Sequence, residues 1–279
     1  IMITDNTKNV IYLADVLPSK MPSFYKHFVK AIAAAGLEYG ILKGTSDIWA
    51  IDYMPVQLSE NQYVQYIFKP DYLTTRKYFH LITDAERVWN NLGLETEVVS
   101  CDLVLDGGNL VYEKDTLIVT DKVFTENADK TKTQVIQLLE NCFHARVIVI
   151  PRADNDIFGH ADGDVRFVNA DTVIVNEPGT QLEYFNKLAN ILKVNKLKYI
   201  CAPCGCRECG LSAMGLYINF LQVGNTIFVP VFDIEQDERA VKFFEDVFSG
   251  CNIIPVKSKQ IAKRGGVLRC VSWSTKNLL

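Results

Sequence analysis

The sequence lacks an excess of charge of either sign. Its 29 Lys and Arg residues are nearly balanced by 33 Asp and Glu residues, which gives a net charge of −4. Nucleic-acid partners generally require a strongly basic surface, so we expect no nucleic-acid partner. The small negative charge would tolerate a cationic substrate but does not by itself argue for one.

Long unbroken hydrophobic runs are also lacking. The most apolar segment, residues 215–232, is interrupted by Asn219, Gln222, Gly224 and Asn225, and this predicts a buried hairpin rather than a membrane span. The first residues do not have the pattern of a signal peptide, so we expect a cytoplasmic protein with no membrane attachment. In that compartment the eight cysteines are expected to be mostly reduced thiols rather than a disulfide framework.

No low-complexity linker divides the chain, so we expect one domain over residues 1–279. Strand-like and helix-like segments alternate along it. The predicted helices are 22–35, 74–93, 132–144, 181–193 and 237–248. The predicted strands are 10–15, 38–43, 47–57, 62–70, 96–106, 109–115, 116–124, 145–151, 159–168, 171–176, 197–203, 217–223, 225–232, 252–257 and 267–273.

A strand–strand–helix–strand unit therefore recurs at a spacing of roughly 55 residues. A repeat of this size indicates modules arranged around an axis, as in a propeller, rather than a doubly wound sheet.

Two polar stretches could carry chemistry. In GHADGDVRF (159–167), His160 and Asp162 would share one face of a regular strand, with Asp164 after them, and an imidazole beside a carboxylate can shuttle protons. A surface histidine with acidic neighbours is an equally good reading. In LVLDGGNLV (103–111), Asp106, two glycines and Asn109 could approach a ligand closely, although a hairpin turn is the simpler interpretation.

Two further stretches contain isolated reactive or charged groups. TSDIWAIDYMPV (45–56) sets Trp49 and Asp52 in an apolar strand, where Asp52 is either an edge charge or faces a polar cavity. Cys270 in KRGGVLRCVSW (263–273) could be a core thiol or a nucleophile. In a propeller-like ring, strand ends from separate modules converge on the axis. There Cys and His would form a nucleophile–base pair, and paired carboxylates would bind a guanidinium.

The motifs DIWxxDYMPVQ, DGGN, GHADGxVRF, GLYINFL and GGVLRCVSW occur in this order over about residues 9–274. In this combination the chain resembles the agmatine deiminases and the bacterial peptidylarginine-deiminase-type proteins, which belong to the guanidino-group-modifying (pentein) superfamily. The resemblance implies an α/β fold, a five-bladed propeller of ββαβ modules with pseudo-fivefold symmetry.

Carried over by motif, the resemblance implies Cys270 as nucleophile and His160 as general acid/base. Asp52 and Asp162 would grip the guanidinium, and Trp49 would line the pocket. The motif around Asp106 and Asn109 implies an acidic site residue and a substrate contact. The family commonly has Arg where this chain has Ile51, which tilts the expected substrate toward agmatine.

The implied reaction hydrolyses agmatine to N-carbamoylputrescine and ammonia through a covalent thiouronium on Cys270, in putrescine and polyamine biosynthesis. It needs no metal or organic cofactor. The alternatives are a peptidylarginine or free-arginine deiminase and, less favoured, a metal-binding or inactive scaffold of the same fold. The expected partner is a small cationic guanidine, and a homo-oligomer is compatible with the sequence.

CAPCGCRECG (201–210) contains Cys201, Cys204, Cys206 and Cys209. Four thiolates could bind Zn²⁺, but one residue between the two Cys pairs would strain a tetrahedral site. A loop of free thiols is therefore favoured over a metal site, and disulfides are the third reading.

Overall fold

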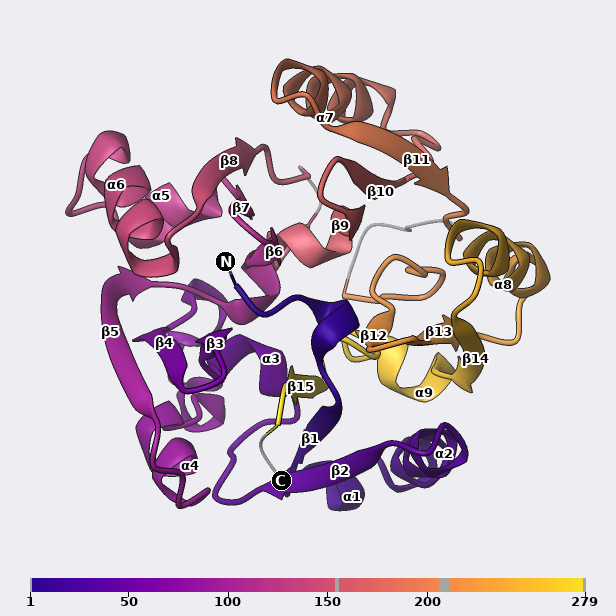
Figure 1. The fold of residues 1–279 in the computed structure, drawn as a ribbon, viewed down its shortest axis with the longest axis horizontal. Helices are drawn as coiled ribbons and strands as arrows, with labels where there is room; N and C mark the ends of the chain where they lie inside the picture. The colour runs from indigo at the N-terminus through magenta and orange to yellow at the C-terminus, as the bar shows by residue number, and fades with distance from the viewer. Residues whose placement is uncertain (1, 154–155, 206–210, 278–279) are drawn as a thin grey trace.

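The computed structural model describes residues 2–153, 156–205 and 211–277. Within them the strands form five three-stranded sheets around a common centre (Figure 1). The sheet orders are β15-β1-β2, β3-β4-β5, β6-β7-β8, β9-β10-β11 and β12-β13-β14. In each blade the middle strand pairs antiparallel with the innermost strand and parallel with the outermost one. The predicted five-bladed α/β propeller is confirmed.

The strand boundaries follow the apolar segments. The strands are β1 Val10–Ala14, β2 Glu38–Leu42, β3 Val56–Ser59, β4 Gln62–Ile67, β5 Glu97–Val104, β6 Val111–Glu113, β7 Thr116–Thr120, β8 Arg146–Ile150, β9 Val165–Asn169, β10 Thr172–Asn176, β11 Lys198–Ala202, β12 Leu221–Val223, β13 Thr226–Val231, β14 Asn252–Lys257 and β15 Ser272–Thr275.

The helices that connect the two parallel strands of each blade lie on the rim of the ring (Figure 1), because such a pair requires a crossover connection. The helices are α1 Leu17–Lys20, α2 Pro22–Ala34, α3 Ala50–Tyr53, α4 Ala85–Asn90, α5 Lys122–Glu126, α6 Lys132–Phe143, α7 Leu182–Val194, α8 Gln236–Val247 and α9 Lys259–Ala262. In α2 the buried Phe24, Phe28 and Ile32 repeat at a spacing of four, which turns one apolar stripe toward the sheets.

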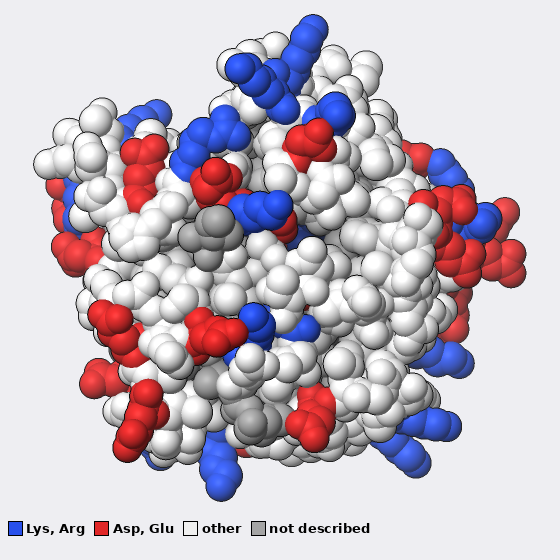
Figure 2. Space-filling view, viewed as in Figure 1, with Lys and Arg blue, Asp and Glu red and all other residues white. Residues whose placement is uncertain are grey.

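The first blade is assembled from both ends of the described chain. β15 pairs antiparallel with β1, with Val10 opposite Thr275 and Leu13 opposite Ser272. This pairing closes the ring. Figure 2 shows acidic and basic side chains interspersed on one face of the molecule, in keeping with the nearly balanced charge.

Several predicted elements differ in the structure. The helix expected over 74–93 is reduced to α4 and one 3₁₀ turn, Phe79–Leu81, and the strand expected over 47–57 is interrupted by α3. The hydroxyl of Tyr66 lies 2.9 Å from the carbonyl oxygen of Asp52 and 3.1 Å from that of Met54, and these contacts favour the helical turn over a strand.

The predicted hairpin turn at Asp106 is also wrong. Gly107–Asn109 forms a 3₁₀ turn, and the flanking strands β5 and β6 belong to different blades.

One disulfide departs from the expectation of mostly reduced cysteines. Cys101 in β5 is bonded to Cys142 in α6, with a Cα–Cα distance of 5.8 Å, and this bond joins two neighbouring blades. The thiols of Cys201, Cys251 and Cys270 are free.

Candidate active site

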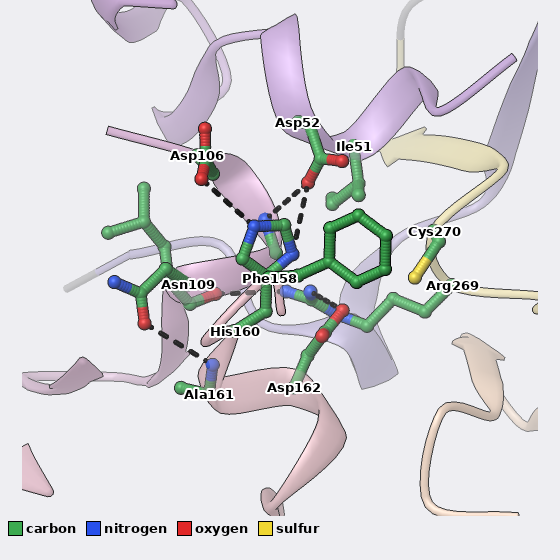
Figure 3. Close-up of polar contacts among 12 residues, drawn as sticks. Ile51, Asp52, Asp106, Asn109, Phe158, His160, Ala161, Asp162, Arg269 and Cys270 are labelled. Atoms are coloured by element: carbon green, nitrogen blue, oxygen red, sulfur yellow. Dashed lines mark hydrogen bonds and ion pairs between the residues drawn. The ribbon is translucent and has the colours of Figure 1, made fainter. Parts of the chain in front are cut away.

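The predicted site residues stand just before the innermost strands of four blades. Asp52 lies in α3 before β3, Asp106 precedes the turn before β6, His160 and Asp162 precede β9, and Cys270 precedes β15. The ring thereby brings their side chains together near its centre (Figure 3).

The expectation that His160 and Asp162 share one face of a strand is wrong. β9 begins only at Val165, and Ala161–Gly163 forms a 3₁₀ turn that carries Asp162. Asp164 is buried at the end of this turn and lines a different cavity of about 410 Å³, with Asn176 and Tyr184.

The His160 ring lies between two carboxylates. Its Nε2 is 2.9 Å from Asp106 Oδ2, and its Nδ1 is 3.7 Å from Asp52 Oδ1 (Figure 3). The backbone N–H of Gly108 donates to the same Asp52 oxygen at 3.0 Å. A Cβ atom on Gly108 would lie 2.5 Å from His160 Nδ1, so only glycine allows this close approach.

Burial and mutual charge set the protonation states of His160 and Asp52. Burial disfavours the imidazolium, but the charge of Asp52 and the hydrogen bond to Asp106 outweigh it and raise the pKa of His160 to about 9. Burial is the main reason that the pKa of Asp52 rises to about 7, with the charges of Asp106 and Asp162 adding to the rise and that of His160 opposing it. At neutral pH the imidazole is therefore protonated and able to donate.

Lys122 is a site residue that the sequence reasoning missed. Its ammonium group is buried, bonds Asp106 Oδ2 and lies 2.9 Å from Glu126 Oε1. Burial alone would raise the pKa of Asp106, but Lys122 and His160 lower it overall. The only available signal was a lysine two residues after the apolar run LIVT, in the blade whose first strand follows DGGN.

Arg269 was also missed. It forms a buried ion pair with Asp162, with Nη1 2.7 Å from Oδ2, and its Nη2 donates to the Leu110 carbonyl at 2.9 Å. One oxygen of the carboxylate that we predicted for a substrate guanidinium is thus held by a guanidinium of the chain itself (Figure 3).

The Cys270 thiol is only partly exposed, and it donates to Asn219 Oδ1 at 3.3 Å. Burial is the main reason that the pKa of Cys270 lies well above its ordinary value, and the negative charges of Asp162 and Asp52 raise it further. The thiol is therefore protonated at neutral pH unless a cation enters beside it.

Trp49 lies against the Cys270 loop. A Cβ atom on Gly266 would be 2.7 Å from the Trp49 ring and 3.0 Å from Cys270 Sγ, so this glycine allows indole and thiol to share one wall. The backbone N–H of Ile51 donates to the Cys270 carbonyl at 3.4 Å, and Figure 3 shows its aliphatic side chain at the position where the resemblance implied Arg.

Two aromatic rings that the sequence analysis did not single out flank His160. The Phe158 ring centre is 5.9 Å and the Tyr72 ring centre 6.0 Å from the imidazole. These two rings meet edge to face, 5.0 Å apart. Together they form an apolar wall beside the His160 imidazole.

Asn109 is tied into the backbone. Its Oδ1 accepts from Thr120 N at 2.8 Å and from Ala161 N at 3.2 Å. Nδ2 is buried and has no hydrogen-bond partner in the part of the chain that the structure describes. The predicted substrate contact would have to use this amide nitrogen.

The cysteine-rich segment lies mainly beyond the described residues. Cys206 and Cys209 are outside them, whereas Cys201 and Cys204 are described and partly buried. Among the described residues, no group of three or more His, Cys, Asp and Glu side chains is arranged to hold a metal ion. No helix in the described ranges is both long and apolar enough to cross a bilayer.

The sequence model of the Porphyromonas-type peptidyl-arginine deiminase family matches residues 26–275. A curated protein of Listeria monocytogenes, provisionally named agmatine deiminase 2, is 22% identical over 208 residues, which are 61% of this chain and 56% of that protein. The match thus spans little more than half of that relative's length.

Solved structures share the fold. The agmatine deiminase of C. jejuni superposes with a TM-score of 0.78 at 19% identity, covering 98% of this chain and 95% of that one. The DDAH of Pseudomonas aeruginosa, a mutant solved with citrulline, has a TM-score of 0.62 at 12% identity, with coverages of 96% and 99%.

Proposed function

Since the chain belongs to the Porphyromonas-type peptidyl-arginine deiminase family, we propose that it hydrolyses the guanidinium group of agmatine, giving N-carbamoylputrescine and ammonia. One observation carries the proposal: a thiol, an imidazole and three carboxylates from four blades meet at one place. This set can bind a planar cation, attack its carbon and supply a proton to the leaving group.

Binding uses the carboxylates. Asp52 and the Oδ1 atom of Asp162 hold the guanidinium nitrogens and set its plane against Cys270, while Arg269 keeps Asp162 oriented through Oδ2. The cation lowers the pKa of the Cys270 thiol, which the empty site keeps high, so that the thiol loses its proton to solvent only when the substrate binds.

Catalysis then proceeds in two halves. The thiolate attacks the guanidinium carbon, and protonated His160 donates its proton to the departing ammonia, which leaves an S-alkylthiouronium on Cys270. Neutral His160 then takes a proton from water as the water attacks the same carbon, and collapse releases the ureido product and Cys270. Asp106, held by Lys122, keeps the imidazole oriented during both halves.

Agmatine is favoured over arginine because the Ile51 side chain offers no charge to an α-carboxylate. The reaction would contribute to putrescine and polyamine formation. A peptidylarginine deiminase is the second candidate, supported by the description of the matching family.

The test measures ammonia and ureido product released from agmatine, free arginine and an arginyl peptide by the wild type and by Cys270→Ala. Turnover of agmatine that disappears in the variant supports the proposal, and turnover of the peptide alone selects the second candidate. Full activity of Cys270→Ala on any of the three substrates would refute the mechanism.

A further inference from the structure

Asn219 stands two residues before β12, the innermost strand of the fifth blade. This is the one blade from which no residue has so far been assigned to the site. Asn219 belongs to the GLYINFL motif and is only 1% exposed, so its amide is removed from bulk water. A buried amide in this position must be explained by the groups that it contacts.

Those groups belong to the loop of the nucleophile. Asn219 Oδ1 lies 3.3 Å from Cys270 Sγ and 3.4 Å from the Cys270 backbone nitrogen, and both of these donate to it. The backbone carbonyl of Asn219 accepts from Arg269 N at 3.3 Å. A single residue therefore makes three hydrogen bonds to two consecutive residues of the next blade.

Asn109 makes the corresponding contacts elsewhere in the ring. It also stands two residues before an innermost strand, β6, and it is also 1% exposed. Its Oδ1 reaches forward to Ala161 N in the next blade, beside His160. For both asparagines, Nδ2 is buried without a hydrogen-bond partner among the described residues. Asn109 and Asn219 thus occupy equivalent positions of the pseudo-fivefold ring. Asn109 fixes the loop that carries His160, and Asn219 fixes the loop that carries Cys270 in the same way.

The backbone of Cys270 fixes the orientation of the Asn219 amide. A peptide N–H can only donate, so it selects Oδ1 over Nδ2 as its neighbour. The thiol consequently faces an acceptor, and an acceptor stabilises S–H over S⁻. The charged side chains that act on the same thiol are Asp52 from α3 and Asp162 from the turn before β9, with Arg269 beside it in its own loop.

We propose that Asn219 is a catalytic residue that holds the Cys270 thiol protonated and in a fixed direction until a cationic substrate arrives. The assignment rests on the proposed role of Cys270 as nucleophile. The proposal predicts two opposite effects of removing the acceptor. The Cys270 thiol should ionise more readily, and turnover should fall because the thiol loses the alignment needed for attack.

The experiment measures the iodoacetamide alkylation rate of Cys270 against pH in the substrate-free protein. Mass spectrometry of the tryptic peptide 270–276 separates this thiol from the other cysteines. The proteins are the wild type, Asn219→Ala, Asn219→Asp and, as a control, Asn225→Ala at an exposed turn of the same blade.

Near pH 8, Cys270 should be alkylated about fivefold faster in Asn219→Ala than in the wild type. The loss of one hydrogen bond to the thiol shifts its ionisation equilibrium by about this factor. Asn219→Ala should also turn over agmatine at least about tenfold more slowly at saturation. Asn219→Asp, a near-isosteric and stronger acceptor, should alkylate more slowly than the wild type. Asn225→Ala should match the wild type in both assays.

Alkylation of Asn219→Ala at or below the wild-type rate would overturn the proposal, as would an unchanged pH profile in Asn219→Asp. The alkylation assay contains no substrate. An enzyme that fails to turn over agmatine would therefore count against the proposed function and leave the test of Asn219 intact.

Discussion

Arg269 and Asp162 form a buried ion pair inside the site, with Nη1 and Oδ2 2.7 Å apart and exposed fractions of 7% and 2%. The residue next to the proposed nucleophile is thereby bonded to the carboxylate predicted to bind substrate. Removing one partner leaves an uncompensated buried charge, which costs more than the pair itself contributes.

Arg269→Gln should therefore lower the free energy of unfolding by about 3–5 kcal/mol. Urea denaturation of the variant and the wild type measures the difference. Arg76→Gln, at an exposed position, serves as the matched control and should change stability by less than about 0.5 kcal/mol. Equal small effects at both positions would show that Asp162 does not depend on Arg269.

The pH dependence of kcat/KM for agmatine should be bell-shaped. Asp52 must be charged to hold the cation and Cys270 must lose its proton to attack, so activity should rise as pH increases through about 7 and beyond. His160 must be protonated to release ammonia, so activity should fall as pH increases through about 9. Because the two groups interact, these apparent values belong to the pair.

Initial rates of ammonia release at low agmatine concentration, measured from pH 5 to pH 10, check this expectation. Asp52→Asn should flatten the acidic limb of whatever activity remains. A plateau that extends down to pH 5 in the wild type would contradict the raised pKa of Asp52.

Lys122→Met should destabilise the protein by about 3–5 kcal/mol, because Asp106 and Glu126 would lose their shared buried cation. Lys187→Met is a matched control: Lys187 pairs with Glu183 at the same i,i+4 spacing, at 2.8 Å, but is 62% exposed. Its loss should cost less than about 0.5 kcal/mol. Thermal and urea unfolding would compare the two, and similar losses would rule out a special role for the buried pair.

Gly266→Ala should impair deimination while the fold persists. The new methyl group would press on the Trp49 ring and on Cys270 Sγ, at an overpacking cost of about 1–3 kcal/mol. Trp49→Phe removes the ring atom nearest to that methyl, so the double variant should recover part of the kcat lost by Gly266→Ala. No recovery relative to the single variants would argue that the clash with Cys270 alone is responsible.

The alternation of strands and helices was readable from the sequence because blade strands are short apolar runs and four of the rim helices are strongly periodic. The convergence of Asp52, Asp106, His160, Asp162 and Cys270 followed from the motifs. The local geometry did not, because the turn at α3 depends on Tyr66 from the neighbouring strand β4.

Lys122, Arg269 and Asn219 were missed for a related physical reason. Arg269 and Asn219 act across a boundary between blades, on Asp162 and Cys270 respectively. Lys122 reaches Asp106 from the far side of the β6–β7 hairpin of its own blade. Nothing within their own segments distinguishes these residues from a surface cation or a hairpin amide, because only the folded ring brings them to their partners.

The pairing of β15 with β1 has a consequence for the order in which the protein becomes active. Cys270 directly precedes the closing strand, so the thiol reaches its neighbours only when the first and last blade strands have found each other. Contacts between segments so distant in sequence form slowly. During refolding, recovery of turnover should therefore lag behind recovery of helix content. The time course of enzyme activity would then report when the ring closes.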